Sequence, residues 1–147
     1  MQTLKPTPSR PLDLARVLVV DNDPASRLTL QTVLQAGGYR VDSAATAAEA
    51  VEKLEDQEYQ LVLSDRQMES PEAGLRVLEY AQCLAYQPAT ALINSESNAV
   101  PATSGNLLIA PQDIPGLLSK VANLIAQRVG RRVRKELRQS KNQLLLL

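Results

Sequence analysis

The stretch LVLSDRQMESPEAG, residues 61–74, decides the fold. Its first four residues are apolar or small, which is typical of a short strand buried in a sheet, and the run stops at Asp65. Met68, Pro71 and Gly74 then indicate a loop before the next helix. Because a carboxylate at the end of a buried strand is costly unless a partner uses it, we expect Asp65 to have a chemical role.

Short apolar runs alternate with helical patterns along the rest of the chain. The helical patterns place apolar residues at intervals of three and four, as in Ala47, Ala50, Val51 and Leu54. This alternation predicts an α/β protein with a doubly wound, five-stranded parallel sheet, and we expect the flavodoxin-like strand order 2-1-3-4-5. The expected strands cover residues 16–20, 40–44, 61–64, 90–94 and 107–110.

Acidic residues follow two of these strands. Asp21 and Asp23 come after the first strand, and Asp65 comes after the third. If the two strands are neighbours, their carboxylates converge at one edge of the sheet, where they repel each other unless a cation bridges them. Hard oxygen ligands without His or Cys favour Mg²⁺. An alternative remains open, in which Asp21 and Asp23 only cap a helix that begins at Pro24 and Asp65 only starts a loop.

The composition excludes several classes of function. The 147 residues are 44% hydrophobic and 22% charged, which fits one globular domain. There is no His, so a Ser-His-Asp or Cys-His enzyme is excluded, and Cys83 is alone, so no internal disulfide forms. We find neither a signal peptide nor an apolar run long enough to span a bilayer, and we therefore expect a cytoplasmic protein without a membrane span.

Three segments together resemble the receiver domain of two-component response regulators. They are VLVVDNDPASR at residues 17–27, LVLSDRQM at 61–68 and LLIAPQDIPGLLSKV at 107–121. The resemblance extends over roughly residues 16–126. It implies a protein of phosphorelay signalling rather than an enzyme, with a histidine kinase or a phosphotransfer protein as its partner.

The resemblance also assigns roles to single residues. In that family, the residue that matches Asp65 accepts a phosphoryl group from a kinase phosphohistidine. The residues that match Asp21 and Asn22 hold Mg²⁺ together with this acceptor, and the backbone carbonyl of the residue that matches Gln67 completes the protein ligands. Phosphoryl transfer needs positioning and charge neutralisation more than covalent chemistry by the protein, so such a site is chemically reasonable.

Several positions depart from the family pattern. Asn22 stands where a second acid is usual, and an amide brings no charge to the metal. Ala110 stands where a Lys normally contacts the phosphoryl oxygens, and Leu107 stands where an aromatic residue usually acts as a switch. The hydroxyl that contacts the phosphate is assigned to Ser95, although Asn94 competes for the same place. We therefore expect Mg²⁺ to bind weakly or not at all.

Two loops depart as well. Glu69 stands where a proline is usual, and Gly74 comes one place late. Residues 95–106 are rich in Ser, Asn, Pro and Gly, which predicts an irregular segment and a fourth helix that is reduced or absent. Two interpretations stay open: Asp65 is a working phosphoacceptor, or the chain is a degenerate receiver that acts as a phosphorylation-independent dimerisation or protein-interaction module.

The C-terminal part of the chain predicts a long basic helix, which is a linker or a coiled coil. Residues 128–141 carry seven cationic residues and one anionic residue, a net charge of +6, which leaves nine cationic and fifteen anionic residues, or −6, in the rest. Apolar residues recur at every fourth position through Val129, Val133 and Leu137, and the pattern continues towards Leu144, which favours a homodimer. The expected domains are a loose leader, a receiver and this helix, at residues 1–15, 16–126 and 127–147.

Other partners are open to interpretation at this stage. The terminal run QLLLL, residues 143–147, indicates either a buried dimer contact or an output domain that follows in a longer protein. A nucleic-acid partner is less favoured, because no helix-turn-helix pattern follows and no aromatic residue is placed for base stacking. An anionic membrane surface is also less favoured, because the apolar face of the helix is poor.

Overall fold

The computed structural model describes residues 15–66, 68–70, 72–93, 107–109 and 114–145. Strands and helices alternate through these residues, as the sequence predicts. The strands are β1 (Arg16–Val20), β2 (Arg40–Ala44), β3 (Leu61–Asp65), β4 (Ala89–Ile93) and β5 (Leu107–Ile109). The helices are α1 (Pro24–Ala36), α2 (Ala47–Asp56), α3 (Ala73–Gln82) and α4 (Ile114–Leu145).

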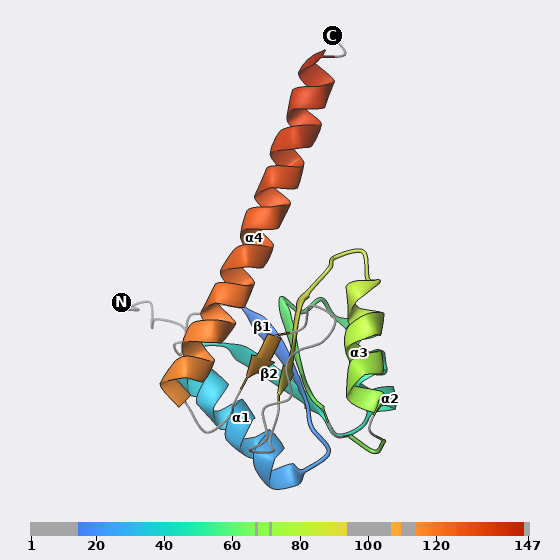
Figure 1. Ribbon diagram of the computed structural model, residues 1–147, viewed down its shortest axis with the longest axis vertical. Coiled ribbons are helices and arrows are strands. Elements are labelled where there is room, and N and C mark those ends of the chain that lie inside the picture. Colours follow the sequence, from blue (N-terminus) through green and yellow to red (C-terminus); the bar gives the residue numbers. More distant parts are fainter. Residues whose placement is uncertain (1–14, 67, 71, 94–106, 110–113, 146–147) are drawn as a thin grey trace, which may run out of the picture.

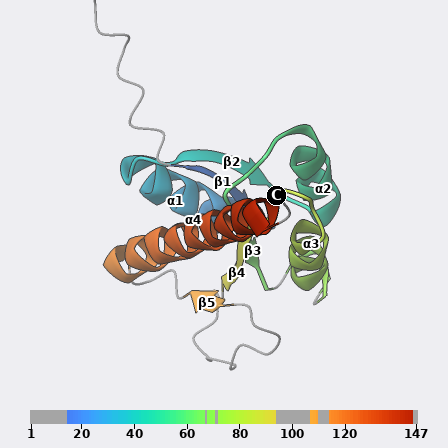
Figure 2. The ribbon, with the colours of Figure 1, turned by 90° about the horizontal axis from the view of Figure 1, so that it is seen from above.

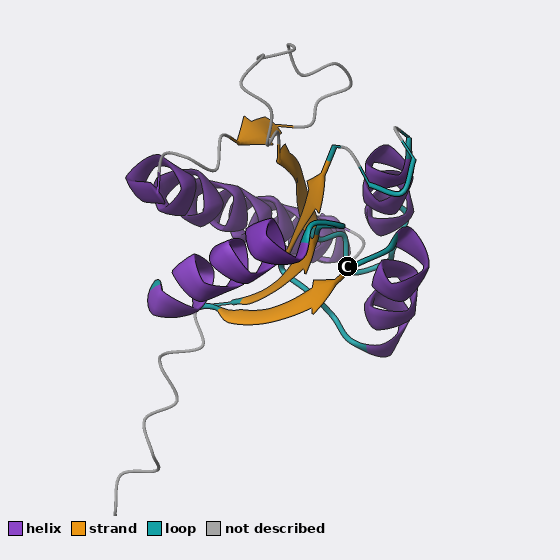
Figure 3. Ribbon diagram, turned by 90° about the horizontal axis from the view of Figure 1, so that it is seen from below, coloured by secondary structure: helices purple, strands orange, loops and turns teal. Residues whose placement is uncertain are grey.

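The strands run parallel in one sheet, in the order β2-β1-β3-β4-β5. Helices α1 and α4 lie on one face of the sheet, and α2 and α3 lie on the other (Figure 2). Figure 3 shows the same three layers from the opposite side, with the strands between the helices. The doubly wound α/β architecture predicted from the sequence is therefore confirmed.

Successive residues of each central strand face opposite helical layers. Val17 and Val19 of β1 lie in the apolar cluster that contains α1 and α4, whereas Leu18 and Val20 lie in the cluster that contains α2 and α3. All four are fully buried. Burial on both faces explains why this strand is a continuous apolar run without the alternation of a half-exposed strand.

Local hydrogen bonds fix the start of the helices next to the carboxyl edge of the sheet. Pro24 is the first residue of α1, and the Oδ2 atom of Asp23 caps the helix by accepting the Ser26 N–H at 3.2 Å. The hydroxyl of Thr46 caps α2 by accepting the Glu49 N–H at 3.1 Å. Both caps hold the loops that follow β1 and β2.

Helix α4 is much longer than the domain that it packs against (Figure 1). Leu117 and Val121 are buried against the sheet, whereas Val133 and Leu137 lie beyond it and are 47% and 64% exposed. The 32 residues form one continuous helix through Gly130, about 48 Å long at about 1.5 Å per residue. The extended C-terminal helix predicted from the sequence is present.

Arg128 fixes the point at which α4 leaves the domain. Its side chain is only 5% exposed, and its Nε and Nη2 atoms donate to the carbonyl oxygens of Gln87 and Tyr86 at 3.0 and 2.7 Å. Gln87 has a φ of 44°, in the left-handed region that a non-glycine residue rarely adopts. The sequence analysis counted Arg128 within the basic segment of the tail, but the structure buries it and uses it to hold this turn.

Some predictions fall on residues that the structure does not describe. They concern the leader through residue 14, the irregular segment at 95–106 with its reduced helix, and the end of the fifth strand at Ala110. Ala15, which the sequence analysis placed in the leader, is buried, and its carbonyl accepts the Arg40 N–H at 2.9 Å.

Within the described residues, no helix combines the length and the apolar character needed to cross a membrane.

Candidate functional site

Asp21 and Asp65 lie at the carboxyl ends of two adjacent parallel strands. Val20 of β1 pairs with Ser64 of β3, so the next residue along each strand is one of the two acids. Asp21 is fully buried and Asp65 is 5% exposed. The sheet thus brings two carboxylates that are distant in the sequence to one edge, as the alternation of strands and helices predicts.

The hydrogen bonds of Asp21 satisfy only one side of its carboxylate. Oδ1 accepts the Asp23 N–H at 3.0 Å, and the backbone carbonyl of Asp21 accepts the Arg27 Nη1 at 2.8 Å. The backbone N–H of Asp21 donates to the Ala44 carbonyl at 3.0 Å. Oδ2 is buried, and no donor among the described residues reaches it. A buried carboxylate oxygen without a partner is costly, so this atom is the one at the sheet edge whose burial the described hydrogen bonds do not explain.

The two residues after Asp21 take other roles. Asp23 is exposed and caps α1, so the capping interpretation is right for this residue. Asn22 is also exposed, and its Nδ2 donates to the Ala45 carbonyl at 3.3 Å, which ties the loop after β1 to the loop after β2. Of the polar residues after β1, Asp21 is the one that the structure buries at the edge next to Asp65.

Gly74 lets the start of α3 pack directly on the backbone of Asp65. A Cβ atom built on Gly74 would lie 2.1 Å from the Asp65 carbonyl oxygen and 3.2 Å from Ser64 Oγ. Ser64 Oγ donates to that same carbonyl at 3.3 Å, and the Arg66 N–H donates to the Ile93 carbonyl at 3.0 Å. The sequence analysis noted the unusual place of Gly74 but did not predict this contact.

Glu69 connects the loop after Asp65 to the neighbouring helix. Its Oε1 atom accepts the Ala47 N–H at 3.0 Å, which is at the first turn of α2. A carboxylate at this position is favourable, because the amino end of a helix carries partial positive charge. The sequence showed Glu69 as a departure from the family pattern, and its spacing from Ala47 gave no signal of this contact.

The remaining predicted site residues cannot be placed. Gln67, Asn94, Ser95 and Ala110 lie outside the described residues, and nothing is described of the Leu107 side chain. Within the described residues, no group of three or more His, Cys, Asp or Glu side chains could hold a metal ion. Among the described residues, the buried acids at this edge are Asp21 and Asp65.

Comparison with known proteins places the chain among signalling domains. Residues 17–105 match the family described as response regulator receiver domain. No curated protein matches the sequence. A receiver domain protein from Methanospirillum hungatei shares 25% identity and a TM-score of 0.68, over 80% of this chain and 98% of that chain.

Two further structures are informative. Response regulator TrrA from Thermotoga maritima, solved in complex with Mg²⁺ and BeF, shares 28% identity and a TM-score of 0.66, over 76% of this chain and 99% of that chain. A fusion that contains a trimeric coiled coil of yeast Spc42 shares 18% identity and a TM-score of 0.71, over 90% of this chain and 98% of that chain. At that identity, the second likeness concerns the fold alone.

Proposed function

Because the chain belongs to the response regulator receiver domain family, we propose that it is an atypical receiver that accepts a phosphoryl group on Asp65 from a histidine kinase or a phosphotransfer protein. On this proposal it works in two-component phosphorelay signalling in the cytoplasm and is not an enzyme for a small substrate. It passes its signal on through α4, to a second copy and to an output domain where one follows.

One observation carries the proposal: the buried Oδ2 of Asp21, which no described donor reaches, lies at the same sheet edge as Asp65. A structural aspartate at a buried strand end would be expected to have both oxygens hydrogen-bonded, because an unpaired buried charge is strongly destabilising. A buried carboxylate oxygen without a hydrogen-bond donor is able to bind a cation, and a bound cation would in turn attract an anionic phosphoryl group.

The residues fit a divalent cation of the Mg²⁺ type, which prefers oxygen ligands and keeps several waters. Asp21 and Asp65 would hold it through their carboxylates, and the Gln67 carbonyl is the further ligand that the family pattern implies. When bound, Mg²⁺ neutralises the negative charge that builds up between the acids and the incoming phosphoryl group. With two carboxylates at the described edge, its affinity should be low.

The chemistry then falls to Asp65. One of its carboxylate oxygens forms the new bond to phosphorus, while the bond from phosphorus to the donor histidine nitrogen breaks and the nitrogen keeps the electron pair. The product is an acyl phosphate on Asp65. Arg27 and Ser64 support the site through the backbone, since they donate to the carbonyl oxygens of Asp21 and Asp65. Ser95 is proposed to contact the phosphoryl oxygens.

The outward face of α4 supports self-association. Val133 comes sixteen residues after Leu117, so at about 100° per residue their side chains lie about 160° apart around the helix. Leu117 is buried in the domain, whereas Val129, Val133 and Leu137 are 50%, 47% and 64% exposed. Val129, Val133 and Leu137 thus form an outer stripe on the side of α4 that faces away from the domain. A homodimer can bury this outer stripe without disturbing the residues of α4 that pack against the sheet.

A second function rests on this same stripe. A degenerate receiver would use α4 as a constitutive dimerisation module and would not need phosphate on Asp65. The departures at Asn22 and Ala110 favour this alternative, because they remove one negative ligand of the metal and the ammonium that usually contacts phosphate.

Phosphorylation with acetyl phosphate and Mg²⁺, read by intact mass, separates the two functions. The proposal predicts the addition of one phosphoryl group to the native chain and none to Asp65→Asn. A matched control is Asp23→Asn, which removes an equal charge from the exposed cap of α1 and should leave the modification in place. No modification of the native chain by acetyl phosphate or by a phosphorylated histidine donor would leave the dimerisation module as the function.

A further inference from the structure

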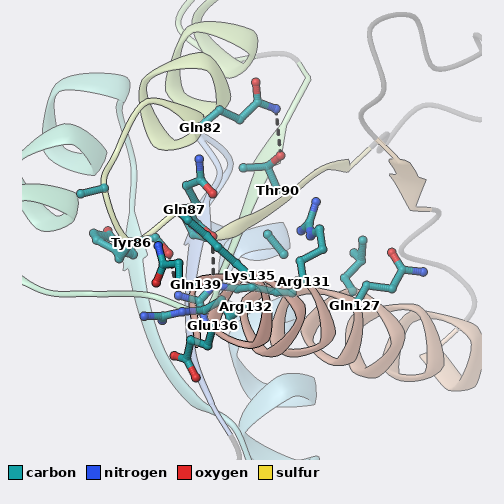
Figure 4. A pocket seen from close by; sticks show the side chains of 15 residues that line it. Gln82, Tyr86, Gln87, Thr90, Gln127, Arg131, Arg132, Lys135, Glu136 and Gln139 are labelled. Carbon is teal, nitrogen blue, oxygen red and sulfur yellow. Dashed lines mark hydrogen bonds between the residues drawn. The ribbon is translucent and has the colours of Figure 1, made fainter. Parts of the chain in front are cut away.

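A cavity of about 590 Å³ lies where α4 passes the loop between α3 and β4. Gln82, Gln87 and Thr90 line it on the side of the domain, and Gln127, Arg131 and Lys135 are among the residues that line it from α4. Figure 4 shows the side chains that come from α4 and those that come from α3, the following loop and β4. The volume is in the range of sites for small ligands, which is about 300–1,000 Å³.

The cavity lies at the edge of the sheet opposite to the acidic site. Ala89 and Thr90, at the start of β4, form part of its wall, whereas Asp65 pairs with Ile93 at the other end of that strand. The outer stripe of α4, centred on Val133, also points away from it. The cavity is therefore independent of the phosphoacceptor and stays open in a dimer built on that stripe.

Four cationic side chains and one anionic side chain line this cavity. They are Arg128, Arg131, Arg132, Lys135 and Glu136. Within the described part of the chain, no ion pair is formed by Arg131, Arg132 or Lys135. The four cations outnumber the single anionic side chain of the lining, and a bound anion would reduce the repulsion among them.

The pKa of the buried Arg128 guanidinium responds both to its burial and to this excess of positive charge. Burial lowers its pKa from the ordinary value, and the nearby charges of Arg132 and Arg131 lower the pKa further, while Glu58 raises it in part. Positive charge is thus less stable here than in water even with Glu58 close by. The amide of Gln87 adds a neutral hydrogen-bonding group that suits the oxygens of an anion, and Gln82 donates to the Thr90 hydroxyl at 3.1 Å beside it.

We propose that this cavity binds a small polyanion of the diphosphate kind, either free or as part of a nucleotide, and that the bound anion cross-links α4 to the loop between α3 and β4. The planar fork of Arg131 and Arg132 matches phosphate geometry, and Lys135 adds a point charge one turn further along the helix. The concave shape between a helix and a loop favours a small ligand over a nucleic-acid backbone, which needs a continuous exposed track.

The test uses inorganic pyrophosphate and ADP as probes, titrated by calorimetry into the full chain without divalent cations, so that Asp21 and Asp65 cannot recruit the anion through a metal. We expect saturable binding of one anion per chain. The double variant Arg131→Gln with Arg132→Gln should weaken it by about tenfold or more. The matched control is Arg134→Gln with Arg138→Gln, which removes the same charge from the same helix at positions outside the cavity lining.

Each outcome decides the proposal. Loss of binding in the cavity variant but not in the control supports it, and tighter binding of ADP than of pyrophosphate identifies the source as a nucleotide. Absence of saturable binding overturns it. Equal weakening in both double variants also overturns it, as does tighter binding of a single-stranded oligonucleotide that the control weakens, because either result assigns the effect to the general charge of the tail.

Discussion

A Cβ atom on Gly74 would lie 2.1 Å from the backbone carbonyl oxygen of Asp65, so the first turn of α3 rests directly on the residue at the end of β3. Real side chains do not approach a carbonyl oxygen this closely. The glycine therefore sets the distance between α3 and the strand that presents Asp65. Any side chain at position 74 would force either α3 or the end of β3 to move.

Gly74→Ala should destabilise the protein and weaken phosphorylation of Asp65. The added methyl group forces α3 or the end of β3 to shift, and overpacking of this kind costs about 1–3 kcal/mol. Urea unfolding measures the loss. Gly130→Ala is the control, because a Cβ there would meet only Arg134 Nη2 at 3.9 Å and should stabilise the helix by up to about 1 kcal/mol. If Gly74→Ala unfolded at the same urea concentration as the native chain, the close packing of α3 on Asp65 would be contradicted.

The sequence allowed the fold and the acidic edge to be predicted because both follow from local patterns. Apolar runs that end at Asp21 and Asp65 predict buried strands, and the parallel direction of neighbouring strands in an α/β sheet brings their carboxyl ends to one edge. The contacts of Gly74 and Glu69 could not be predicted, because they depend on how a loop lies against α2 and α3. Likewise, in the sequence Arg128 is one of seven cationic residues of the basic segment, and its burial could not be predicted because it depends on the turn at Gln87.

Asn22→Asp should increase the affinity for Mg²⁺. The substitution adds a full negative charge at the edge that holds Asp21 and Asp65, and one unit charge about 4 Å from a divalent cation gains about 2 kcal/mol even in water. We therefore expect the dissociation constant for Mg²⁺ to fall by about thirtyfold. Titration of the intrinsic tyrosine fluorescence or calorimetry measures it. Unchanged affinity in Asn22→Asp, with unchanged affinity in Asp21→Asn, would place the metal elsewhere.

Arg128→Met should destabilise the domain even though Arg128 belongs to the basic segment. The methionine keeps the apolar stem but removes the two donors that reach Tyr86 and Gln87, and hydrogen bonds from charged groups contribute about 1.5–3 kcal/mol. Arg138→Met, at an exposed position on the same helix, should change stability by less than about 0.5 kcal/mol. Equal stability of the two variants would show that Arg128 does not hold the turn.

Tyr59 should make the fold sensitive to alkaline pH. Its phenol is buried and donates to Asp42 Oδ2 at 2.7 Å, and burial first, then this hydrogen bond and the charge of Asp42, raise its pKa above the ordinary 10.0. A raised pKa in the folded state means that the fold binds the proton more tightly than the unfolded chain does. The stabilisation is therefore complete below pH 10.0 and falls as the pH rises above that value.

The comparison with Tyr59→Phe tests this dependence. The variant loses the hydrogen bond and about 1 kcal/mol at neutral pH, but it cannot ionise at this position. The difference in unfolding free energy between the native chain and the variant should stay constant up to about pH 10 and shrink as the pH rises from there to about pH 11. The other tyrosines are present in both proteins, so the comparison isolates the side chain at position 59. A difference that stays constant over this range would contradict the prediction.

Leu137→Glu should prevent the proposed self-association through α4 and leave a monomer. The outer stripe of α4 is exposed in the single chain, and burying each of its aliphatic side chains in a dimer contributes about 1.5–3 kcal/mol, whereas a buried glutamate has no partner there. Gln139→Glu adds the same charge about 160° away from Leu137, on the cavity side of the helix, and should leave the association intact. Arg134 and Lys141 lie about 100° and 80° from Val133, so they flank the seam and repel their copies in a parallel pair. Added salt shortens the Debye length to about 8 Å at physiological strength and should tighten the association. Sedimentation at low and high salt measures both effects.

Two outcomes would rule out this interface. One is a monomer at high salt and high protein concentration, and the other is a dimer that survives both Leu137→Glu and truncation after Ala126. A trimer would keep the exposed stripe of α4 as the interface but change the number of chains around it.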